Sequence, residues 1–523
     1  MTEPEIFPTH ERSAAPRVRI TRRFEAPFST ILTAARTCYS SKGVVRDEDL
    51  KPGGEGLARE LHAAGHHTTI EHAYFQFSLE NVSRQFLWTF LHSHPFYNSE
   101  QVSQRYVKVK PDACFVPPLH GEALDVYREG LEQQFAFYRE LMERLHPLAA
   151  DAYDARFPAR KRRRDRYGKE IDKKAQEIAR YVLPVATFAY LYHTVSALTI
   201  LRYWRMCGQP GVAHEQRLVV GMMVEALLEA DPRYLMLVEE PIPAEETPEA
   251  KFFAGRPALG AAGVRKEFVA EFDRSLGGRV SKLVDWKARG EEELARAVRE
   301  VLGLPSSALS DDEAIELAVA PSRNAILGES LNVTTLDRLT RAMHHPGYTF
   351  RRKISHTADS QDQRHRTTPA SRPILAAHAT GEADFVTPEL VRQDPAVLAR
   401  YEEMMERIWE RIGRLARLGV PDEFALYLLP NAVAVRYTES TDFLALRHKL
   451  VMRLCYLAQE EIWRASVDEA QQVLEVHPRL GRHLLPPCGV RKEAGTTPWC
   501  PEGARFCGEP VWDYDLDAYR RVI

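Results

Sequence analysis

Short segments of this chain occur in two diverged versions far apart, and this repetition constrains the fold more than any other feature. Ala179–Pro184 reads Ala-Arg-Tyr-Val-Leu-Pro, and Ala425–Pro430 reads Ala-Leu-Tyr-Leu-Leu-Pro. A chain of 523 residues is long for one compact domain and suits two or three. We therefore predict a tandem duplication, with a first unit over residues 17–245, a second over residues 265–485, and a cysteine-containing tail over residues 486–523.

Hydrophobic patterning in the first unit predicts both strands and helices. Ala73–Leu79 alternates aromatic and smaller residues with the period of a half-buried strand, and Val18–Ile20 is a second candidate strand. Helical patterns cover longer stretches, namely Ile31–Arg36, Leu124–Leu145, Ile171–Leu183 and Phe188–Trp204. This mixture predicts an α+β fold, present twice.

Composition excludes several classes of protein. The apolar content of 44%, the charged content of 27% and the net charge of −3 are ordinary for a globular protein and favour neither a nucleic acid nor a membrane as partner. The basic run Arg160–Arg164 is diluted by Asp165, Glu170 and Asp172, which favours a solvated helix entry over a polyanion site. The N-terminus lacks the pattern of a signal peptide, so we expect a cytoplasmic protein.

Three of the seven cysteines, Cys488, Cys500 and Cys507, cluster in the Pro/Gly-rich tail. A structural zinc ion needs a fourth ligand, for which His477 or His483 could serve, but the spacing matches no common zinc finger. A structural zinc site and simply packed thiols therefore both remain open for the tail. The other four cysteines lie singly, as buried free thiols usually do: Cys38, Cys114, Cys207 and Cys455.

Two further fragments complete each other. Ser103–Tyr106 reads Ser-Gln-Arg-Tyr, and Gln361–Arg366 ends in Arg-His-Arg. Joined, they resemble the signature of the flavin-dependent thymidylate synthases, in which a helix ending in Arg-His-Arg precedes Ser-x-Arg-Tyr. Counted from the helix start at Ser83, the first half has His92–His94 in place of Arg-His-Arg, whereas the second half, counted from Ser355, has lost Ser-x-Arg-Tyr. The resemblance implies that each half keeps what the other has dropped.

The resemblance also implies a reaction and a fold. Family members methylate deoxyuridine monophosphate (dUMP) at ring carbon 5, using methylenetetrahydrofolate, NADPH and a flavin, and pack helices on a mainly antiparallel sheet. A dianionic phosphate is best held by arginine forks and hydroxyl donors. One wall of the substrate site would be Ser103, Gln104, Arg105, Tyr106 and Arg180 from the first half. Gln361 and Arg453 would face them, with Arg453 as the catalytic residue that stabilises negative charge on the uracil.

The same register places Arg453 shortly before Ala458–Ile462, which resembles the family's Ala-Gln-x-Glu-Ile sequence. In the first half, Cys207 stands at the arginine position, and Val212–Glu215 is a remnant that we read as shifted. The first half therefore keeps Arg180 and the second half keeps Arg453.

Flavin contacts are implied by two stretches. Gly65–His72 resembles the family's Gly-His-x-(Thr/Ser)-x-x-Glu-His, which makes His66 and Thr68 candidate FAD contacts rather than metal ligands. Arg364, His365 and Arg366 would bring positive charge to the ring system, where reduced flavin becomes anionic. The family's Asn-x-Arg element is replaced by Ser196–Leu198 in one half and by Asp442–Leu444 in the other.

Two functions follow from these residues. The first is an FAD-dependent methyltransferase that makes dTMP from dUMP at a composite site, with two chains pairing as a homodimer that imitates the family's tetramer. The alternative is a diverged homologue without that activity, either a pyrimidine-nucleotide-binding scaffold or an enzyme acting on another pyrimidine nucleotide.

Overall fold

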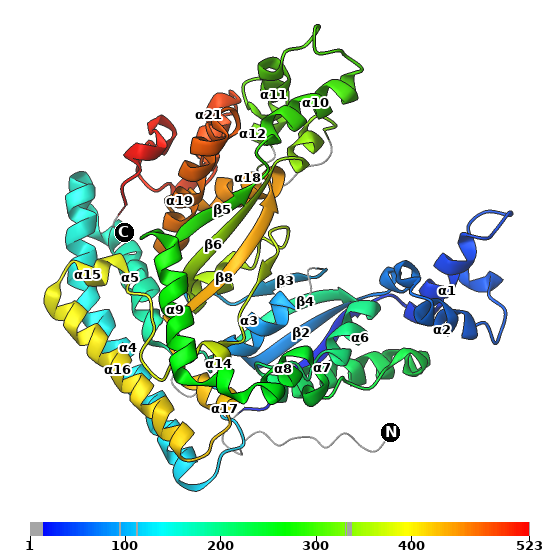
Figure 1. Cartoon of the computed structure of the whole chain (residues 1–523), viewed down its shortest axis with the longest axis horizontal. Coiled ribbons are helices and arrows are strands. Elements are labelled where there is room, and N and C mark those ends of the chain that lie inside the picture. Colours follow the sequence, from blue (N-terminus) through cyan, green and yellow to red (C-terminus); the bar gives the residue numbers. More distant parts are fainter. Residues whose placement is uncertain (1–13, 94–95, 111–112, 330, 332–336, 522–523) are drawn as a thin grey trace.

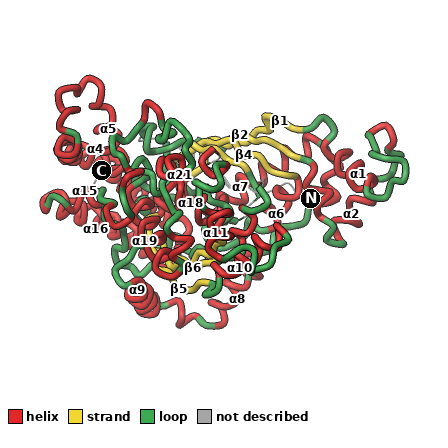
Figure 2. Tube along the Cα trace, turned by 90° about the horizontal axis from the view of Figure 1, so that it is seen from above, coloured by secondary structure: helices red, strands yellow, loops and turns green. Residues whose placement is uncertain are grey.

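A computed structural model describes residues 14–93, 96–110, 113–329, 331 and 337–521. Figure 1 shows two arms, each containing a sheet, that diverge from a junction covered by the long helices α4 (Gly121–Arg156) and α16 (Pro395–Arg417). The sheets form two separate groups of strands when the molecule is seen from above (Figure 2). Within the described residues, no helix combines the length and the apolar character needed to cross a bilayer.

Both sheets have four strands in the same topological order. The first sheet runs β1-β2-β4-β3 and the second β5-β6-β8-β7, with every neighbouring pair antiparallel. The strands of the first are β1 (Arg17–Arg23), β2 (Tyr74–Ser83), β3 (Asn98–Gln101) and β4 (Phe188–Ser196). Those of the second are β5 (Ser281–Trp286), β6 (Gly347–Ser355), β7 (Ala370–Ser371) and β8 (Ala434–Asp442). The α+β class and the duplication are thus confirmed.

The register of the central strands relates the two halves residue by residue. Ser83 pairs with Phe188, and Ser355 pairs with Ala434. The register of β2 shifts after Glu80, and Asn81 at this irregularity has a positive φ of 56°. A β-bulge of this kind adds one residue to one strand and bends it. Beyond the bulge, the pair Leu79–Leu191 of the first half corresponds to the pair Arg352–Tyr437 of the second half.

Helices follow the central strands in the same way in both halves. Ser83 and Ser355 accept hydrogen bonds from the third residue of α3 (Arg84–His92) and α13 (His356–Asp362). Such N-caps satisfy an otherwise unpaired helical N–H and fix where the helix starts. Later in each half, α6 (Ala197–Arg205) is matched by α18 (Phe443–Arg453), and α7 (Ala213–Ala230) by α19 (Glu460–Val476).

One predicted element was wrong. The stretch Phe188–Trp204, expected to be a single helix, is β4 followed by α6. In β4, buried Ala189, Leu191 and His193 alternate with more exposed residues, which is the period of a strand. The helix begins at Ser196, whose side chain caps the N–H of Thr199. A cap inside an otherwise continuous apolar pattern was the signal for this boundary.

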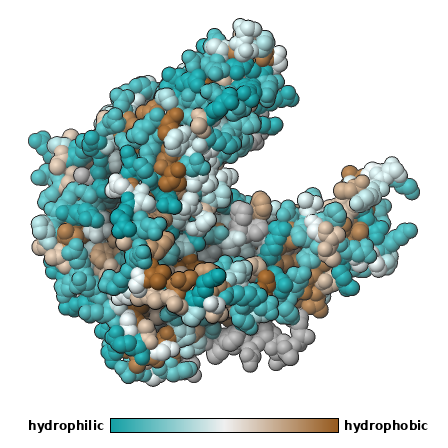
Figure 3. Space-filling model, viewed as in Figure 1, coloured by the Kyte–Doolittle hydropathy of each residue, from teal (hydrophilic) through white to brown (hydrophobic). Residues whose placement is uncertain are grey.

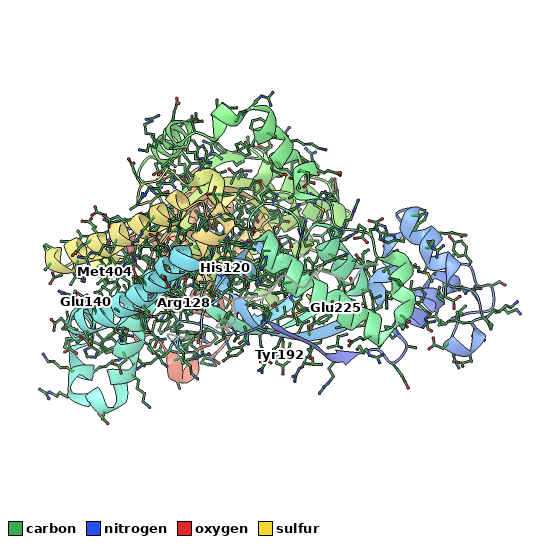
Figure 4. The ribbon with its side chains drawn as sticks, turned by 90° about the horizontal axis from the view of Figure 1, so that it is seen from below. His120, Arg128, Glu140, Tyr192, Glu225 and Met404 are labelled. Atoms are coloured by element: carbon green, nitrogen blue, oxygen red, sulfur yellow. The ribbon has the colours of Figure 1, made fainter. Side chains whose placement is uncertain are left out.

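The halves interlock through the repeated Leu-Pro segments. The N–H of Val185 donates to Leu429 O at 2.9 Å, and the N–H of Asn431 donates to Leu183 O at 2.8 Å. Because each bond is the counterpart of the other, the two halves are related by a local pseudo-two-fold axis. Beside this axis, α4 and α16 run side by side, with Glu140 and Met404 labelled on them in Figure 4.

Helix α16 shows how its sequence determines this packing. Asp394 accepts hydrogen bonds from Ala396 N and Val397 N, and Pro395 occupies the first turn, so the helix start is fixed. Its buried side chains recur at helical spacing and enter the first half's core, namely Val397, Tyr401, Met404, Met405, Ile408 and Leu415. A helix of the second half thus packs into the core of the first half, so the halves are not independent bodies.

The remaining helices surround the sheets. They are α1 (Pro27–Thr37), α2 (Gly56–Ala63), α5 (Arg164–Ala179), α8 (Pro248–Gly255), α9 (Ala262–Leu276), α10 (Gly290–Leu302), α11 (Asp311–Val319), α12 (Ile326–Glu329), α14 (Leu375–His378), α15 (Glu389–Arg392), α17 (Asp422–Ala425), α20 (Pro478–Gly481) and α21 (Pro487–Glu493). Val511 and Tyr519 of the tail lie in the second half's core. The tail is therefore part of the second half's packing.

Candidate functional site

The fragment Ser103–Tyr106 lies against the second half, although some 350 residues separate them in sequence. Arg105 Nη2 donates to Leu457 O at 2.9 Å, and Gln104 Oε1 accepts from Asn431 Nδ2 at 3.1 Å. The backbone N–H of Arg105 donates to Ser103 Oγ at 3.3 Å, and the Arg105 guanidinium lies 5.4 Å from the centre of the exposed Tyr106 ring. The first-half fragment thus borders the loop that follows Arg453.

Arg453 is positioned by the other fragment. Its Nε donates to His365 Nε2 at 2.9 Å, and its Nη2 donates to Gln361 O at 2.9 Å. Gln361 Nε2 in turn donates to Gln459 Oε1 at 2.6 Å. Burial lowers the pKa of Arg453, and nearby Arg364 and Arg105 lower it further, whereas Asp362 opposes them. Arg105 and Arg453, from different halves, therefore lie close enough to repel each other.

Arg180 completes the cationic wall of the first half. Its Nε donates to Glu177 O at 3.1 Å, and its side chain is almost fully buried. In the part of the chain that the structure describes, Nη2 of Arg180 has no hydrogen-bond partner. Burial opposes ionisation of Glu177, but Lys174 and Arg105 lower the pKa of this carboxyl to about 2. A buried guanidinium with an unused donor beside other cations is suited to an anionic ligand.

A pocket of about 190 Å³ adjoins this region and is bordered by both halves. Arg364 Nη2 lies 3.0 Å from Glu100 Oε2, and the Arg366 guanidinium lies 5.1 Å from the centre of the Tyr97 ring. The lining residues are Leu91, Tyr97, Asn98, Ser99, Glu100, Gln101, Gln363, Arg364 and Arg366. In Figure 3 the face between the two arms is hollowed. Two cations and an aromatic ring make this pocket suited to a flat, electron-rich group.

His66 and Thr68 lie elsewhere. His66 precedes, and Thr68 lies in, the short 3₁₀ helix His67–His72, which packs against α1, α2 and α6. Figure 1 shows α1 and α2 at the outer end of the first arm, away from the junction. Within one chain, these two residues are therefore not brought together with Arg364–Arg366.

The pseudo-symmetric position has different chemistry. Leu426 stands where the first half has Arg180, and Cys207 stands where the second half has Arg453; both side chains are buried. Leu426 packs in an apolar cluster with Trp88, Val185 and Leu375. Arg180 and Arg453 thus have no cationic residue at their equivalent positions in the other half. His94, the last residue of the stretch that replaces Arg-His-Arg in the first half, lies outside the described residues.

Sequence reasoning missed a group of buried charges behind Arg453, which we call the ion cluster: Arg352, Asp362, Glu439, Lys449 and Glu469. Lys449 Nζ contacts Glu439, lies 3.3 Å from Glu469 Oε2 and 3.6 Å from Asp362 Oδ2. Asp362 Oδ1 lies 3.6 Å from Arg453 Nε, so the cluster meets the candidate site at this carboxylate.

The first half has no such cluster among its described residues. The strand register and helix caps place apolar, aromatic and histidine side chains at the equivalent positions, namely Leu79, Phe90, His193, Tyr203 and Met223. Phe90 and Tyr203 have ring centres 4.3 Å apart. Two cations and three anions on an otherwise amphipathic sheet and its helices were the overlooked signal, since buried charges occur in proteins only with partners.

A second missed feature joins the halves symmetrically. Glu215 Oε2 accepts from Ser83 Oγ and from Tyr427 Oη, each at 2.6 Å. Glu461 accepts from Ser355 Oγ and Tyr181 Oη at the same distances. Glu215 is therefore the counterpart of Glu461, and the reading of Val212–Glu215 as shifted was wrong. The two helical caps and the cross-half tyrosines explain why this glutamate occupies the same place in both halves.

The replaced Asn-x-Arg element has a structural role in both halves. Ser196 caps α6, and Asp442 caps α18 by accepting from Ala445 N at 2.8 Å. Leu198 and Leu444, at the arginine positions, are buried in the two cores. Leucine cannot bind phosphate, so neither segment can perform the role that the family arginine has.

All seven cysteines are free thiols. Within the described ranges, no group of three or more His, Cys, Asp or Glu side chains is arranged as a set of metal ligands, around Cys488, Cys500 and Cys507 included. His477 Nδ1 instead forms a hydrogen bond of 2.9 Å with Tyr348 Oη, and His483 Nε2 lies 3.2 Å from Glu316 Oε1. Neither histidine is therefore a fourth ligand for the tail cysteines.

The fold defines a class: an α+β protein built from two diverged halves that a pseudo-two-fold axis relates. Residues 19–233 and 282–479 each match the family described as thymidylate synthase complementing protein. The chain belongs to this family, as a tandem duplication.

The chain is also similar to individual named proteins. The flavin-dependent thymidylate synthase of Clostridium tetani is 30% identical over 186 residues, which cover 34% of this chain and 69% of the relative. That of Sulfurisphaera tokodaii is 31% identical over 159 residues, or 29% of this chain and 59% of the relative. The UMP/dUMP methylase PolB from Streptomyces cacaoi, solved with 5-Br dUMP, is 19% identical, with a TM-score of 0.32 over 42% of this chain and 95% of that one.

Proposed function

We propose that this protein methylates dUMP to dTMP in an FAD-dependent reaction, with methylenetetrahydrofolate and NAD(P)H as co-substrates, at one site shared by its two halves. The observation that supports the proposal is that Arg105 of the first half, which lies near Arg180, donates to Leu457 O in the loop that follows Arg453 of the second half. The curated relatives named above are flavin-dependent thymidylate synthases, which supports the same chemistry.

The phosphate of the substrate is the group that would best balance the positive charge of these side chains. Arg105, Arg180 and Lys174 lie around a single carboxylate, Glu177. A phosphate dianion would neutralise the excess positive charge and accept a hydrogen bond from the unused Nη2 of Arg180. Gln104 is fixed by Asn431 and by Gln176, which donates to Gln104 O at 3.0 Å, so this wall of the site is rigid before the ligand arrives.

Arg453 is assigned to the pyrimidine ring. Its two bonds to His365 and Gln361 O hold the guanidinium in place. Negative charge develops on the uracil carbonyls when a one-carbon unit is attached at carbon 5, and a preorganised cation in a dry site stabilises that charge by roughly 3 kcal/mol or more. Asp362 opposes the lowering of the pKa of Arg453 by burial.

Arg364, His365 and Arg366 would hold the flavin ring beside this site. When bound, the flavin supplies the hydride chemistry of the reaction. The pocket chemistry fits the ring, whereas Leu198 and Leu444 leave the diphosphate without the family arginine. His66 and Thr68, at the outer end of one arm, would reach a flavin only in a second chain. We therefore propose a homodimer that places this arm of one chain at the junction of the other.

The two buried leucines favour a second candidate function. A chain that binds a pyrimidine nucleotide but not FAD would keep the arginine wall and lose the synthase activity. It would then act as a nucleotide-binding scaffold or on another pyrimidine nucleotide by other means.

One experiment separates these functions. The purified protein is examined for a visible flavin band, bleached with NADPH, and reoxidised with and without dUMP and methylenetetrahydrofolate. A bound flavin whose reoxidation yields dTMP supports the synthase, and Arg105→Ala and Arg453→Ala abolish the product while Arg205→Ala, at a half-exposed pair with Glu239, does not. A colourless protein that takes up no FAD yet binds dUMP supports the scaffold.

A further inference from the structure

Four cysteines that are far apart in sequence line one small cavity. Its volume is about 10 Å³, room for a single water-sized sphere. Cys488, Cys500 and Cys507 come from the tail, and Cys455 comes from the loop between α18 and α19. Sequence spacing grouped three of these thiols and offered His477 or His483 as the fourth ligand, because Cys455 lies 33 positions before the next of the four cysteines.

The donor set suits a metal. Zinc prefers a tetrahedral set of sulfur or nitrogen ligands, and four cysteine sulfurs make one of the common structural sets. The four cysteines that line this cavity therefore supply a complete set of ligands.

The polypeptide around these cysteines has little else to order it. Between the end of α21 at Glu493 and Val511, the described regular structure is one three-residue 3₁₀ turn, Gly503–Arg505. Short loop-rich segments of this kind are often stabilised by a structural metal. Pro486, Pro487, Pro501 and Phe506 form the cavity walls and shield it from water.

We propose that Cys455, Cys488, Cys500 and Cys507 bind one zinc ion in a tetrahedral four-sulfur site. The side chains are not arranged as ligands in this structure. Binding requires each thiol to lose its proton and to rotate about its side-chain torsions until the sulfurs lie about 2.3 Å from the metal.

Zinc at this place would connect the tail to the candidate substrate site. Cys455 is two residues beyond Arg453, and Leu457 O in the same loop accepts from Arg105. The tail also crosses to the first half, where Arg156 Nη2 lies 2.6 Å from Glu509 Oε2. The metal would thus hold the loop that follows Arg453 against the first half. This consequence, unlike the metal site itself, depends on the proposed function.

The test uses cobalt(II) alone as the probe on the full-length, reduced, metal-free protein. Four-thiolate coordination predicts an intense near-ultraviolet charge-transfer band and strong visible bands that saturate at about one cobalt per chain and are displaced by zinc. Protein purified under reducing conditions should contain about one zinc per chain. Neither reading requires nucleotide or flavin, so failure of the proposed function leaves the metal result intact.

Two variants locate the site. Cys488→Ser should lower zinc affinity at least tenfold and weaken the cobalt bands, whereas Cys38→Ser, at an exposed thiol, should leave both unchanged. The proposal is overturned if the wild-type protein shows no thiolate-to-cobalt band, if Cys488→Ser retains the full band, or if mass spectrometry of the protein as purified finds these cysteines in disulfides.

Discussion

Lys449 offers a stringent test of how the second half tolerates its ion cluster. Its ammonium is fully buried and faces three carboxylates, Glu439, Glu469 and Asp362. Burial raises the pKa of Glu439 although Lys449 and Arg352 oppose it, so this carboxylate is already costly to keep ionised. After Lys449→Met, Arg352 would be the cation that remains inside the ion cluster to balance the three carboxylates, and Arg453 would remain at the edge of the cluster.

Removing one partner from a buried charge network costs roughly 3–5 kcal/mol, because the remaining charge is uncompensated. Because the halves interlock, we expect the whole chain of 523 residues to unfold as one unit, for which this loss corresponds to a fall in unfolding temperature of about 3–5 °C. The double change Lys449→Met with Glu439→Gln removes one charge of each sign, and we expect it to recover at least half of that loss. Replacing buried ions together with neutral groups is often close to neutral in stability.

Thermal unfolding of the four proteins in the double-mutant cycle measures the coupling between Lys449 and Glu439. Met223→Leu is the matched control, because Met223 is the first-half counterpart of Glu469 and the change conserves both volume and charge. It should cost less than about 1.5 kcal/mol. The reasoning is refuted if Lys449→Met costs less than about 1 kcal/mol, or if the two single changes add without coupling.

Three further predictions concern the paired caps and the buried leucines. Burial raises the pKa of Glu215 from 4.5 to about 7, so the folded state holds a proton that the unfolded chain releases, and its stability falls as pH rises through that window. Glu215→Gln should therefore gain relative to wild type by up to about 1.4 kcal/mol per pH unit between pH 5 and 7, as unfolding at several pH values would show. Tyr181→Phe and Tyr427→Phe should each cost about 1.5–3 kcal/mol in urea unfolding, since each removes a hydrogen bond to a buried carboxylate; Tyr181→Phe should cost more, because it also removes the acceptor of Gln459 Nε2, and a larger cost for Tyr427→Phe would contradict this reasoning. Leu198→Ala should cost about 2–5 kcal/mol as a cavity in the first core, and unchanged stability would show that this leucine is not packed as described.

Much of this arrangement could be predicted from local sequence. The repeated Leu-Pro segments identify the duplication, and alternation in Ala73–Leu79 predicts the strand that became β2. Phe188–Trp204 was misread because aromatic and apolar residues continue across the strand-to-helix boundary at Ser196. Helical and strand periods are hard to separate in such a run, and the capping serine was the available signal.

The site was harder to predict, because its geometry depends on the pseudo-two-fold axis. The complementary losses indicated which fragments belong together, and the structure places Arg105 and Arg453 near each other, but their roles stay predictions. Neither Glu177 nor Cys455 could be identified as a site residue from the sequence. Glu177 pairs with Arg105, and Cys455 lines a cavity with the tail cysteines, so both depend on contacts with distant segments. The spacing of residues within one segment does not indicate which distant segments will contact it.

The most direct measurement is calorimetric titration of the protein with dUMP. The account predicts one site per 523-residue chain. Arg105→Ala and Arg453→Ala should each weaken binding by about 100-fold, since losing charge-assisted hydrogen bonds costs about 3 kcal/mol, whereas Arg205→Ala should change it little. Two equivalent sites per chain, or affinity that survives both alanine substitutions, would contradict a single site built from the two halves.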